Sequence, residues 1–500
     1  MLHNTFLRII FLFCLILSSM ALFAACSKGS SPGGENNNKS NLPDDSAEDG
    51  TKAPDVNYVE ELPEMDFGGE TFTFLSYGDG TDKSWHAMDV VAEEDSGDPL
   101  DDAITARNRN VEERFGVKIA VNFNGSPSSV AKSVKSGGND FDAVWLDMNG
   151  SGVSAQSGYF LNLRELTYIN LDKLYWDQSV TRDLSVANKV YFATGDVSIV
   201  DKRATWILMF NKALLSRFAF ESPYALVNSG DWTMDKFTEI AKNASKNLNG
   251  TGIWDENDQY GFSTTNDTIP GLFYSCGEKV VVKNSEDMLE FAYNDSANLN
   301  KLHDIIQKSV EIMKNNNITL CSADIKAAEP WKLTKAAFED NRALFYGEVA
   351  AYVVNLRAME TDFGIIPMPK YNKEQQHYIS YVNPAACFLG VPVTCADTAF
   401  VSVIIEAMAA ESSRILKPAY YDVLLKEKGA RDEESVEMLD LIFQHRVYDL
   451  GLIYNYGEVV SSYTGLVAKG DANVASMIDK QSAKAEKQIN DFNNKILDLD

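Results

Sequence analysis

The feature that most constrains the fold is an alternation of strand and helix patterns between residues 70 and 146. Residues 70–75 and 117–123 alternate apolar with polar side chains, and residues 141–146 form an apolar run. These patterns predict strands, whereas the helical spacing of apolar side chains over residues 100–115 predicts a helix. A second, polar and Ser-rich helix is expected between residues 123 and 141. Because a β-α-β-α-β order requires crossover connections, the sequence predicts an α/β fold built on a mainly parallel sheet.

The first of these helices has a start signal and a stop signal. Asp98 occupies the N-cap position, where its carboxylate accepts a backbone N–H, and Pro99 follows at the first helical position. Gly116 comes directly after Phe115, the last apolar residue of the pattern. We therefore expect this helix to end at Gly116.

The length of the chain predicts more than one lobe. Domains usually hold about 100 to 200 residues, and this chain has 500, of which 45% are hydrophobic. Its 72 acidic and 45 basic residues give a formal net charge of −27. Because such a protein repels a polyanion, nucleic-acid binding is excluded.

The first 25 residues have the pattern of an export signal. The apolar run over residues 9–23 is too short to span a bilayer comfortably, and it ends in small residues. Residues 23–26, Phe-Ala-Ala-Cys, resemble the bacterial lipobox, although Phe23 stands where leucine is usual. The resemblance implies a signal peptide over residues 1–25 and a lipid anchor with palmitate on Cys26. The alternative is an ordinary signal peptide with an incidental thiol.

The segment after this cysteine has the composition of a tether. Residues 27–55 hold almost no large apolar side chain, so they cannot offset the entropy lost on ordering. As a random coil this stretch would reach on the order of 30 Å. We expect a flexible tether over residues 26–62 that holds the folded body at the extracytoplasmic face of the membrane.

Four further cysteines lie in the folded body: Cys276, Cys321, Cys387 and Cys395. They form no C-x-x-C pair of the kind that binds zinc or does redox chemistry. A bridge between Cys387 and Cys395 and buried free thiols are equal alternatives at this point.

The histidines after the signal segment are His86, His303, His377 and His445. They show neither an H-E-x-x-H motif nor another spacing typical of metal ligands. We expect no metal site and no cofactor.

Five segments in a fixed order carry a resemblance to one family. The first three are DAVWLDMNGSGVSAQSGYFLNL at 142–163, VYFATGDVSIVDKRATWILMFNKALL at 190–215 and DWTMDKFTEIAK at 231–242. The last two are FEDNRALFYG at 338–347 and FGIIPMPKY at 363–371. Together they resemble the extracellular solute-binding proteins of carbohydrate ABC transporters (family 1), the group that includes maltose-binding protein.

The resemblance spans roughly residues 66–412. It departs from the family in a longer loop after the first strand and in a poorly matching C-terminal third.

The resemblance implies a type II periplasmic-binding-protein-like fold, in which two lobes flank a ligand cleft at the hinge. Each lobe would be a mainly parallel sheet flanked by helices. Lobe one would comprise residues 63–203 and 346–395, and lobe two residues 204–345 and 396–500. The implied function is capture of a sugar or oligosaccharide and its delivery to the transmembrane subunits of an ABC import permease. We expect a monomer without enzymatic activity.

The candidate ligand-binding residues follow from the place of the cleft. Ligands of open parallel sheets bind beyond the carboxyl ends of the strands, and sugars pair with planar polar groups and stack on aromatic rings. For each position the alternative is a core aromatic or a turn-forming polar residue. The candidates are Tyr77, Asp79, Trp85, Trp145, Asp147, Asn149, Trp206, Asn266, Asp267, Tyr274, Tyr346, Glu348, Tyr381 and Asn383.

Two other function classes fit the sequence. A secreted glycosidase would also combine a sugar cleft with two catalytic carboxylates. The chain has 72 acidic residues, and the sequence does not show which of them lie at the separation that catalysis requires. A surface glycan-binding lipoprotein without a transporter would share the anchor and the tether. The α/β pattern favours the transporter-linked protein, because surface adhesins are usually built of β-sandwich modules.

Overall fold

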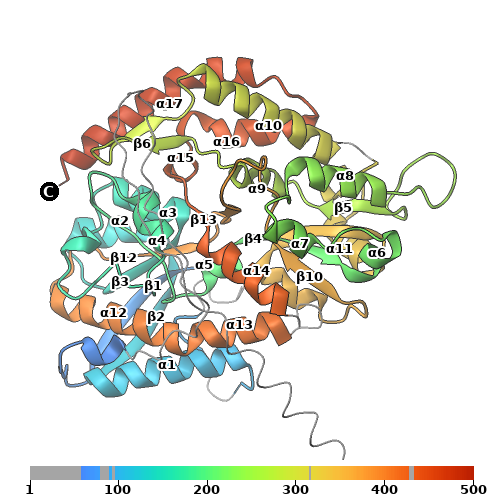
Figure 1. Ribbon diagram of the computed structural model, residues 1–500. Helices are drawn as coiled ribbons and strands as arrows, with labels where there is room; N and C mark the ends of the chain where they lie inside the picture. Colours follow the sequence, from blue (N-terminus) through green and yellow to red (C-terminus); the bar gives the residue numbers. More distant parts are fainter. Residues whose placement is uncertain (1–57, 79–88, 93–95, 315–316, 427–432, 500) are drawn as a thin grey trace, which may run out of the picture. The chain divides into compact units, whose positions relative to one another are not determined.

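The alternating segment forms a parallel sheet in the computed structural model, as predicted (Figure 1). β1 (Glu70–Tyr77) pairs in parallel with β2 (Val117–Gly125) and with β3 (Ala143–Asp147). The antiparallel edge strand β12 (Cys387–Gly390) completes the order β12-β3-β1-β2. This four-stranded unit is the first sheet.

The structure describes residues 58–78, 89–92, 96–314, 317–426 and 433–499. The predicted signal peptide, Cys26, Asp79 and Trp85 lie outside these residues, as does the tether up to residue 57. The chain divides into two units, Met1–Pro54 and Asp55–Asp500, and both sheets described here belong to the second.

The helix α1 (Pro99–Phe115) begins and ends where the sequence predicts. The Asp98 carboxylate accepts the Leu100 N–H at 2.8 Å, which stabilises the first turn. Gly116 has a left-handed φ of 61°, and a Cβ at this position would lie 2.0 Å from the Asp66 carboxylate. Both the backbone conformation and the lack of space therefore require glycine here.

A second sheet of five strands forms the other large β structure. β5 (Tyr260–Thr264) pairs in parallel with β8 (Thr319–Cys321) and with β9 (Ala343–Val349). β4 (Trp206–Asn211) is antiparallel to β9 and to β10 (Phe363–Ile366), which gives the order β10-β4-β9-β5-β8. The fold class is therefore α/β with two separate sheets, as predicted.

Two short ribbons connect distant parts of the chain. β11 (Ser380–Tyr381) pairs in parallel with β13 (Arg446–Val447), and β6 (Val281–Lys283) pairs with β7 (Leu289–Phe291). The first ribbon joins residues more than 60 positions apart, which no local sequence pattern indicates.

Helices pack against each sheet. On the first sheet's side α1 packs against α12 and α13, and on the second sheet α8 and α11 pack against β5. Figure 1 shows α10, α16 and α17 side by side, in agreement with their contacts. The α-helices that follow α1 are α2 (Pro127–Ser136), α3 (Met148–Gln156), α4 (Gln178–Leu184), α5 (Val200–Arg203), α6 (Lys212–Phe218), α7 (Pro223–Asn228), α8 (Met234–Ala244), α9 (Thr268–Ser275), α10 (Ser296–Lys314), α11 (Pro330–Glu339), α12 (Thr398–Arg414), α13 (Leu416–Lys426), α14 (Glu433–Gln444), α15 (Leu450–Ile453), α16 (Val459–Lys469) and α17 (Val474–Leu497).

Five short 3₁₀ helices complete the secondary structure of the described residues: η1 (Tyr58–Glu61), η2 (Leu163–Glu165), η3 (Ser322–Asp324), η4 (Ala350–Leu356) and η5 (Tyr456–Glu458).

Three chain segments, at residues 204–205, 350 and 382–383, contact one another. The Ala350 N–H donates to the Thr205 carbonyl at 2.9 Å, and the Asn383 N–H donates to the Ala204 carbonyl at 2.9 Å. Thr205 also forms a β-bridge with Val382. Ala204 and Thr205 directly precede β4, and Asn383 lies between β11 and β12, where the chain passes from one sheet to the other. Ala350 follows β9 and leads to β10 of the same sheet.

Strand membership differs from the predicted lobe limits at two places, although the limits themselves stay a prediction. Tyr346 was expected in lobe one, yet it belongs to β9 of the second sheet. Residues 396–500 were expected in lobe two, yet α12 packs on α1 beside the first sheet. The sequence could not reveal this, because α12 is apolar nearly all round and its pattern does not say which sheet it covers.

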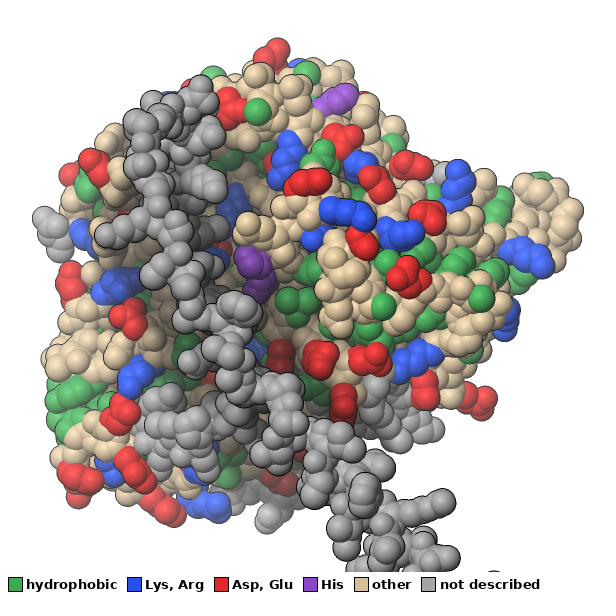
Figure 2. Space-filling model, viewed as in Figure 1, with side chains coloured by type: hydrophobic (Ala, Val, Ile, Leu, Met, Phe, Trp, Pro, Cys, Tyr) green, Lys and Arg blue, Asp and Glu red, His purple; other side chains and the backbone are tan. Residues whose placement is uncertain are grey.

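The described helices include none that is both long enough and apolar enough to cross a membrane. Figure 2 shows basic and acidic side chains interspersed over much of the face in view. Exposed pairs of opposite charge among the described residues include Lys332 and Glu329, 2.6 Å apart at the start of α11. Exposed pairs of this kind contribute little to stability.

Candidate functional site

The carboxyl ends of β5 and β9 bring two acidic side chains to one edge of the second sheet. The strands are parallel and adjacent, with Ser263 opposite Tyr346. β5 ends three residues before Asp267, and Glu348 is the second-last residue of β9. Parallel neighbours end at the same edge, so the pairing predicts that Asp267 and Glu348 meet there. We call Trp206, Asp267, Thr268, Glu348 and Tyr381 the carboxyl-edge cluster.

Asp267 lies at the N-cap position of α9 without capping it. Its carboxylate accepts no hydrogen bond from the helix, and burial raises the pKa of this carboxyl above its usual range. Among the described residues no basic side chain forms an ion pair with it. The carboxylate is thus available to a group outside the described structure.

Glu348 is the more strongly perturbed of the two acids. Burial raises the pKa of this carboxyl to about 7, and the nearby Asp267 charge raises it further, whereas the Val349 N–H, 3.0 Å from Oε1, lowers it. None of these causes is a cation. A carboxyl with a pKa near 7 can both donate and accept a proton close to neutral pH.

Three aromatic side chains lie beside this edge. Trp206 begins β4, and its ring centroid lies 6.5 Å from that of Tyr381, whose own ring stacks on Tyr274 at 5.3 Å and 5°. Trp206 is 1% exposed, and its indole N–H has no hydrogen-bond partner among the described residues. Tyr274 has a structural role, since its hydroxyl donates to Asp449 at 3.0 Å.

Two buried hydroxyls at the same edge also lack partners. The side chains of Ser263 and Thr268 are both 0% exposed, and neither Oγ nor Oγ1 has a hydrogen-bond partner in the described structure. The sequence analysis missed both residues. Their place could have been found from the strand-end rule that identified Asp267, because Thr268 is the next residue in the chain.

On the first sheet, the predicted residues at the end of β3 contribute to packing. Trp145 is 1% exposed and stacks on Phe74 with ring centroids 6.4 Å apart. The Asp147 carboxylate caps α3 by accepting the Gly150 N–H at 2.6 Å, and burial raises its pKa. Asn149 donates to the Ile453 carbonyl at 3.1 Å. A ligand-binding role for these three residues stays a prediction.

The remaining candidates lie in several places. Tyr77 ends β1 and is half-buried. Tyr346 packs on Phe338 in a core cluster, with ring centroids 5.5 Å apart. The Asn266 side chain accepts a hydrogen bond from the Cys321 thiol at 3.2 Å. Asn383 lies in a turn, where its side chain accepts the Ala385 N–H. Of the predicted set, the structure therefore brings together Trp206, Asp267, Tyr274, Glu348 and Tyr381.

A dense set of charges lies beside the crossing segments, and the sequence analysis did not anticipate it. Arg446 of β13 contacts Asp177 at 2.6 Å and Asp201 at 2.8 Å, and all three side chains are buried. Lys202 pairs with Asp196 at 3.0 Å, and Tyr448 donates to Asp177 at 2.9 Å. No motif identifies this network, because its members are up to 271 positions apart.

Neither the thiols nor the histidines form a metal or redox site in the described structure. None of Cys276, Cys321, Cys387 and Cys395 forms a disulfide, so of the two alternatives for Cys387 and Cys395 the structure has the unbridged thiols. No group of three or more His, Cys, Asp and Glu residues that could hold a metal ion occurs among the described residues.

His377 and His445 do contact each other, with Nδ1 and Nε2 2.9 Å apart. Burial, aided by the neighbouring His377, lowers the pKa of His445 to about 4.

Known proteins share this fold at low sequence identity. No family model matches the sequence, and no curated protein matches it. A sugar transporter from Rhizobium etli in an open conformation is 13% identical, with a TM-score of 0.54 over 83% of this chain and 98% of that one. A family 1 extracellular solute-binding protein from Bifidobacterium longum subsp. infantis is 14% identical, with a TM-score of 0.53 over 83% and 99%.

A third solved structure is an ABC substrate-binding protein from Listeria monocytogenes in complex with cycloalternan. It is 12% identical, with a TM-score of 0.50 over 86% of this chain and 100% of that one. All three likenesses extend over nearly the whole length of the solved chains. The chain thus has the two-lobed α/β fold of the family 1 extracellular solute-binding proteins of ABC transporters.

Proposed function

We propose that this protein captures a sugar or oligosaccharide between its two lobes and delivers it to an ABC import permease. The observation that carries the proposal is the carboxyl-edge cluster, in which acidic, hydroxyl and aromatic side chains meet at strand ends. Carboxylates and hydroxyls pair with sugar hydroxyls, and indole or phenol rings stack on the apolar C–H faces of a sugar. The fold shared with sugar-binding proteins supports this assignment.

The protein would act outside the cytoplasm on a lipid tether. The N-terminal segment with its lipobox-like residues supports export and attachment through Cys26. The transmembrane subunits of the permease would bind the ligand-loaded form, and the protein itself would remain monomeric.

A thermal-shift screen against a panel of neutral, amino and acidic oligosaccharides tests the proposal. A ligand at 100 times its dissociation constant stabilises the folded state by about 2.7 kcal/mol, which raises the melting temperature measurably. We expect at least one saccharide to do so, with a dissociation constant that calorimetry confirms. If none of the saccharides binds, the proposal is wrong.

Hydrolysis of a glycan is the second candidate, and one observation favours it. Glu348 has a pKa of about 7 with the Asp267 carboxylate nearby, which is the combination that a glycosidase uses for its general acid and its second carboxylate. Prolonged incubation of the bound saccharide with the protein separates the two candidates. We expect the saccharide to be recovered intact, whereas new reducing ends that disappear in Glu348→Gln would identify an enzyme.

A further inference from the structure

Asp267 is exposed and Glu348 is half-buried, and neither carboxylate pairs with a cation in the described structure. Each has its pKa raised by burial, and the Asp267 charge adds to the effect on Glu348. Among the described residues no lysine, arginine or histidine pairs with either group. Neighbouring like charges repel each other, so two unpaired carboxylates at one edge favour a cation between them.

The neighbouring hydroxyls point to a ligand at the same place. Ser263 is opposite Tyr346 in the parallel ladder, and Tyr346 and Glu348 lie on one face of β9 because alternate residues of a strand share a face. The Ser263 hydroxyl and the Glu348 carboxylate therefore lie on the same face of the sheet. Ser263 and Thr268 are both fully buried with unpartnered hydroxyls, which is rare in a native structure without a missing partner.

We propose that the carboxyl-edge cluster selects saccharides that carry a free, protonated amine, with Asp267 and Glu348 binding the ammonium and the neighbouring hydroxyls binding sugar oxygens. This inference rests on the proposed function and names the ligand class of its site. A neutral sugar donates hydrogen bonds to the two carboxylates but leaves their mutual repulsion in place. An ammonium removes it, because charge-assisted bonds to both carboxylates are the stronger ones.

The same electrostatics disfavour acidic sugars. A uronate would bring a third carboxylate next to Asp267 and Glu348, and like charges at close range repel. The cluster therefore predicts an order of affinity: amine above neutral, and neutral above acidic.

Calorimetry with the processed full-length protein tests this order. The probes are glucosamine oligomers with free amines, their fully N-acetylated counterparts of equal length, and uronate oligomers. We expect the free-amine oligomer to bind at least tenfold more tightly than the N-acetylated one at pH 6.

Two isosteric variants and a matched control locate the effect. In Asp267→Asn and Glu348→Gln we expect the preference for the amine to fall at least fivefold, with binding of the N-acetylated oligomer within threefold of wild type. The control is Asp142→Asn, since burial also raises the pKa of Asp142, but this residue precedes β3 at the opposite, amino end of the first sheet. The preference of Asp142→Asn for the amine over the N-acetylated oligomer should equal that of wild type.

The outcomes distinguish this inference from the proposed function. If neutral oligomers bind as tightly as amine oligomers in the wild type, the inference is wrong and the sugar-binding function stands. The same holds if the preference survives in both isosteric variants. Failure of every saccharide to bind would overturn the proposed function as well.

Discussion

Asp147 ends β3 and caps α3, because its carboxylate accepts the Gly150 N–H at 2.6 Å. The same carboxylate was predicted to accept hydroxyls of a ligand. A cap contributes about 1 kcal/mol to stability, whereas a charged hydrogen bond to a ligand contributes roughly 1.5 to 3 kcal/mol to binding. The two roles are separable, because a serine also caps a helix but carries no charge.

For Asp147→Ala we expect a loss of about 1 kcal/mol in the free energy of unfolding, measured with denaturant, because α3 loses its cap. Asp147→Ser should stay within about 0.5 kcal/mol of wild type. If Asp147 contacts the ligand, both variants bind it about tenfold more weakly in calorimetry. An affinity within twofold of wild type in Asp147→Ser would remove this residue from the site.

The contribution of Arg446 to stability depends on its two acidic partners. Its guanidinium contacts Asp177 and Asp201, and all three side chains are at most 5% exposed. Burial raises the pKa of Asp201 in spite of the attraction to Arg446 and Lys202. Removing the guanidinium would therefore leave two buried carboxylates without their main partner.

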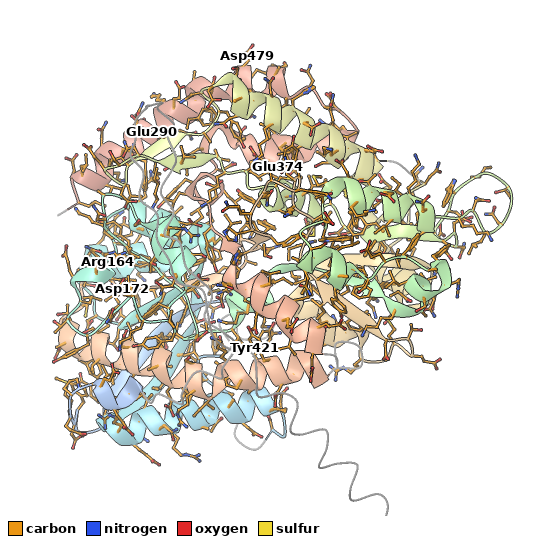
Figure 3. The ribbon with its side chains drawn as sticks, in the orientation of Figure 1. Arg164, Asp172, Glu290, Glu374, Tyr421 and Asp479 are labelled. Atoms are coloured by element: carbon orange, nitrogen blue, oxygen red, sulfur yellow. The ribbon has the colours of Figure 1, made fainter. Side chains whose placement is uncertain are left out.

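We expect Arg446→Met to lower the free energy of unfolding by about 3 to 5 kcal/mol in urea titrations. The double variant Arg446→Met with Asp177→Asn should lose less than the sum of the two single losses, since it removes a charge from each side. Arg164→Met is the control, because Arg164 is exposed and lies at the molecular surface (Figure 3). A loss below about 1 kcal/mol in Arg446→Met would contradict the importance of the network.

At the scale of single elements, the sequence predicted the outlines of β1, α1, β2 and β3 because short-range rules govern them. Strand periodicity, an N-cap at Asp98 and a left-handed glycine at Gly116 each depend only on neighbouring residues. The ribbon of β11 and β13 could not be predicted, since each strand has two residues and neither has a periodic pattern. Its formation depends on the surrounding packing.

α12 contains a buried acid whose titration affects stability. The Glu406 carboxylate accepts the Tyr175 hydroxyl at 2.5 Å and the Trp176 indole N–H at 3.0 Å, which connects α12 to the loop before α4. Burial outweighs these bonds and raises the pKa of Glu406 to about 7, from a usual value of 4.5. A folded-state pKa above the unfolded one means that the folded state binds the proton more tightly.

The contribution of Glu406 to stability is therefore full below pH 4.5 and is lost as the pH rises through about 7. We expect Glu406→Gln to become more stable relative to wild type as the pH increases from 4.5 to 8, measured by denaturant unfolding at each pH. Glu290→Gln, an exposed change on β7, should show no such trend (Figure 3). A pH-independent difference for Glu406→Gln would show that its folded-state pKa is not raised.

At the scale of the whole molecule, the crossing segments bear on how the protein works. The Asn383 N–H donates to the Ala204 carbonyl, so the connection that enters the second sheet at β4 and the one that returns to the first sheet at β12 lie close together. Few backbone changes are then needed for one lobe to move relative to the other, as in hinge closure around a ligand. A ligand that contacts both lobes would stabilise the closed form by its extra contacts.

We expect small-angle scattering to show a smaller radius of gyration when a tightly binding saccharide is added to the protein. Only the closed form lets both lobes contact the ligand, which shifts the population towards it. The same measurement with a saccharide that calorimetry finds not to bind is the control. An unchanged radius at saturation would exclude hinge closure.

The predicted lipid anchor on Cys26 also concerns the whole molecule, because it determines whether the protein is held at a membrane. In a bacterium that processes lipoproteins, Cys26→Ala should abolish acylation, and the protein should move from the detergent phase to the aqueous phase in phase separation. The control variant Ser27→Ala keeps Cys26, so it should partition as the wild-type protein does. Wild-type protein without an acyl mass on its N-terminus would contradict the lipobox interpretation.

The sequence by itself determined the α/β class and the boundaries of the first strands and helices, because periodicity and capping act over a few residues. It also named Asp267 as a candidate, since polar residues after strands collect at a sheet edge, and Glu348 from its place near the expected return to lobe one. The binding role of both residues stays a prediction. Only the tertiary structure decided that Trp145 and Tyr346 are buried in cores, that Arg446 joins Asp177 and Asp201, and that two hydroxyls beside the acids lack partners. These facts depend on contacts between residues far apart in the chain, which local patterns do not encode.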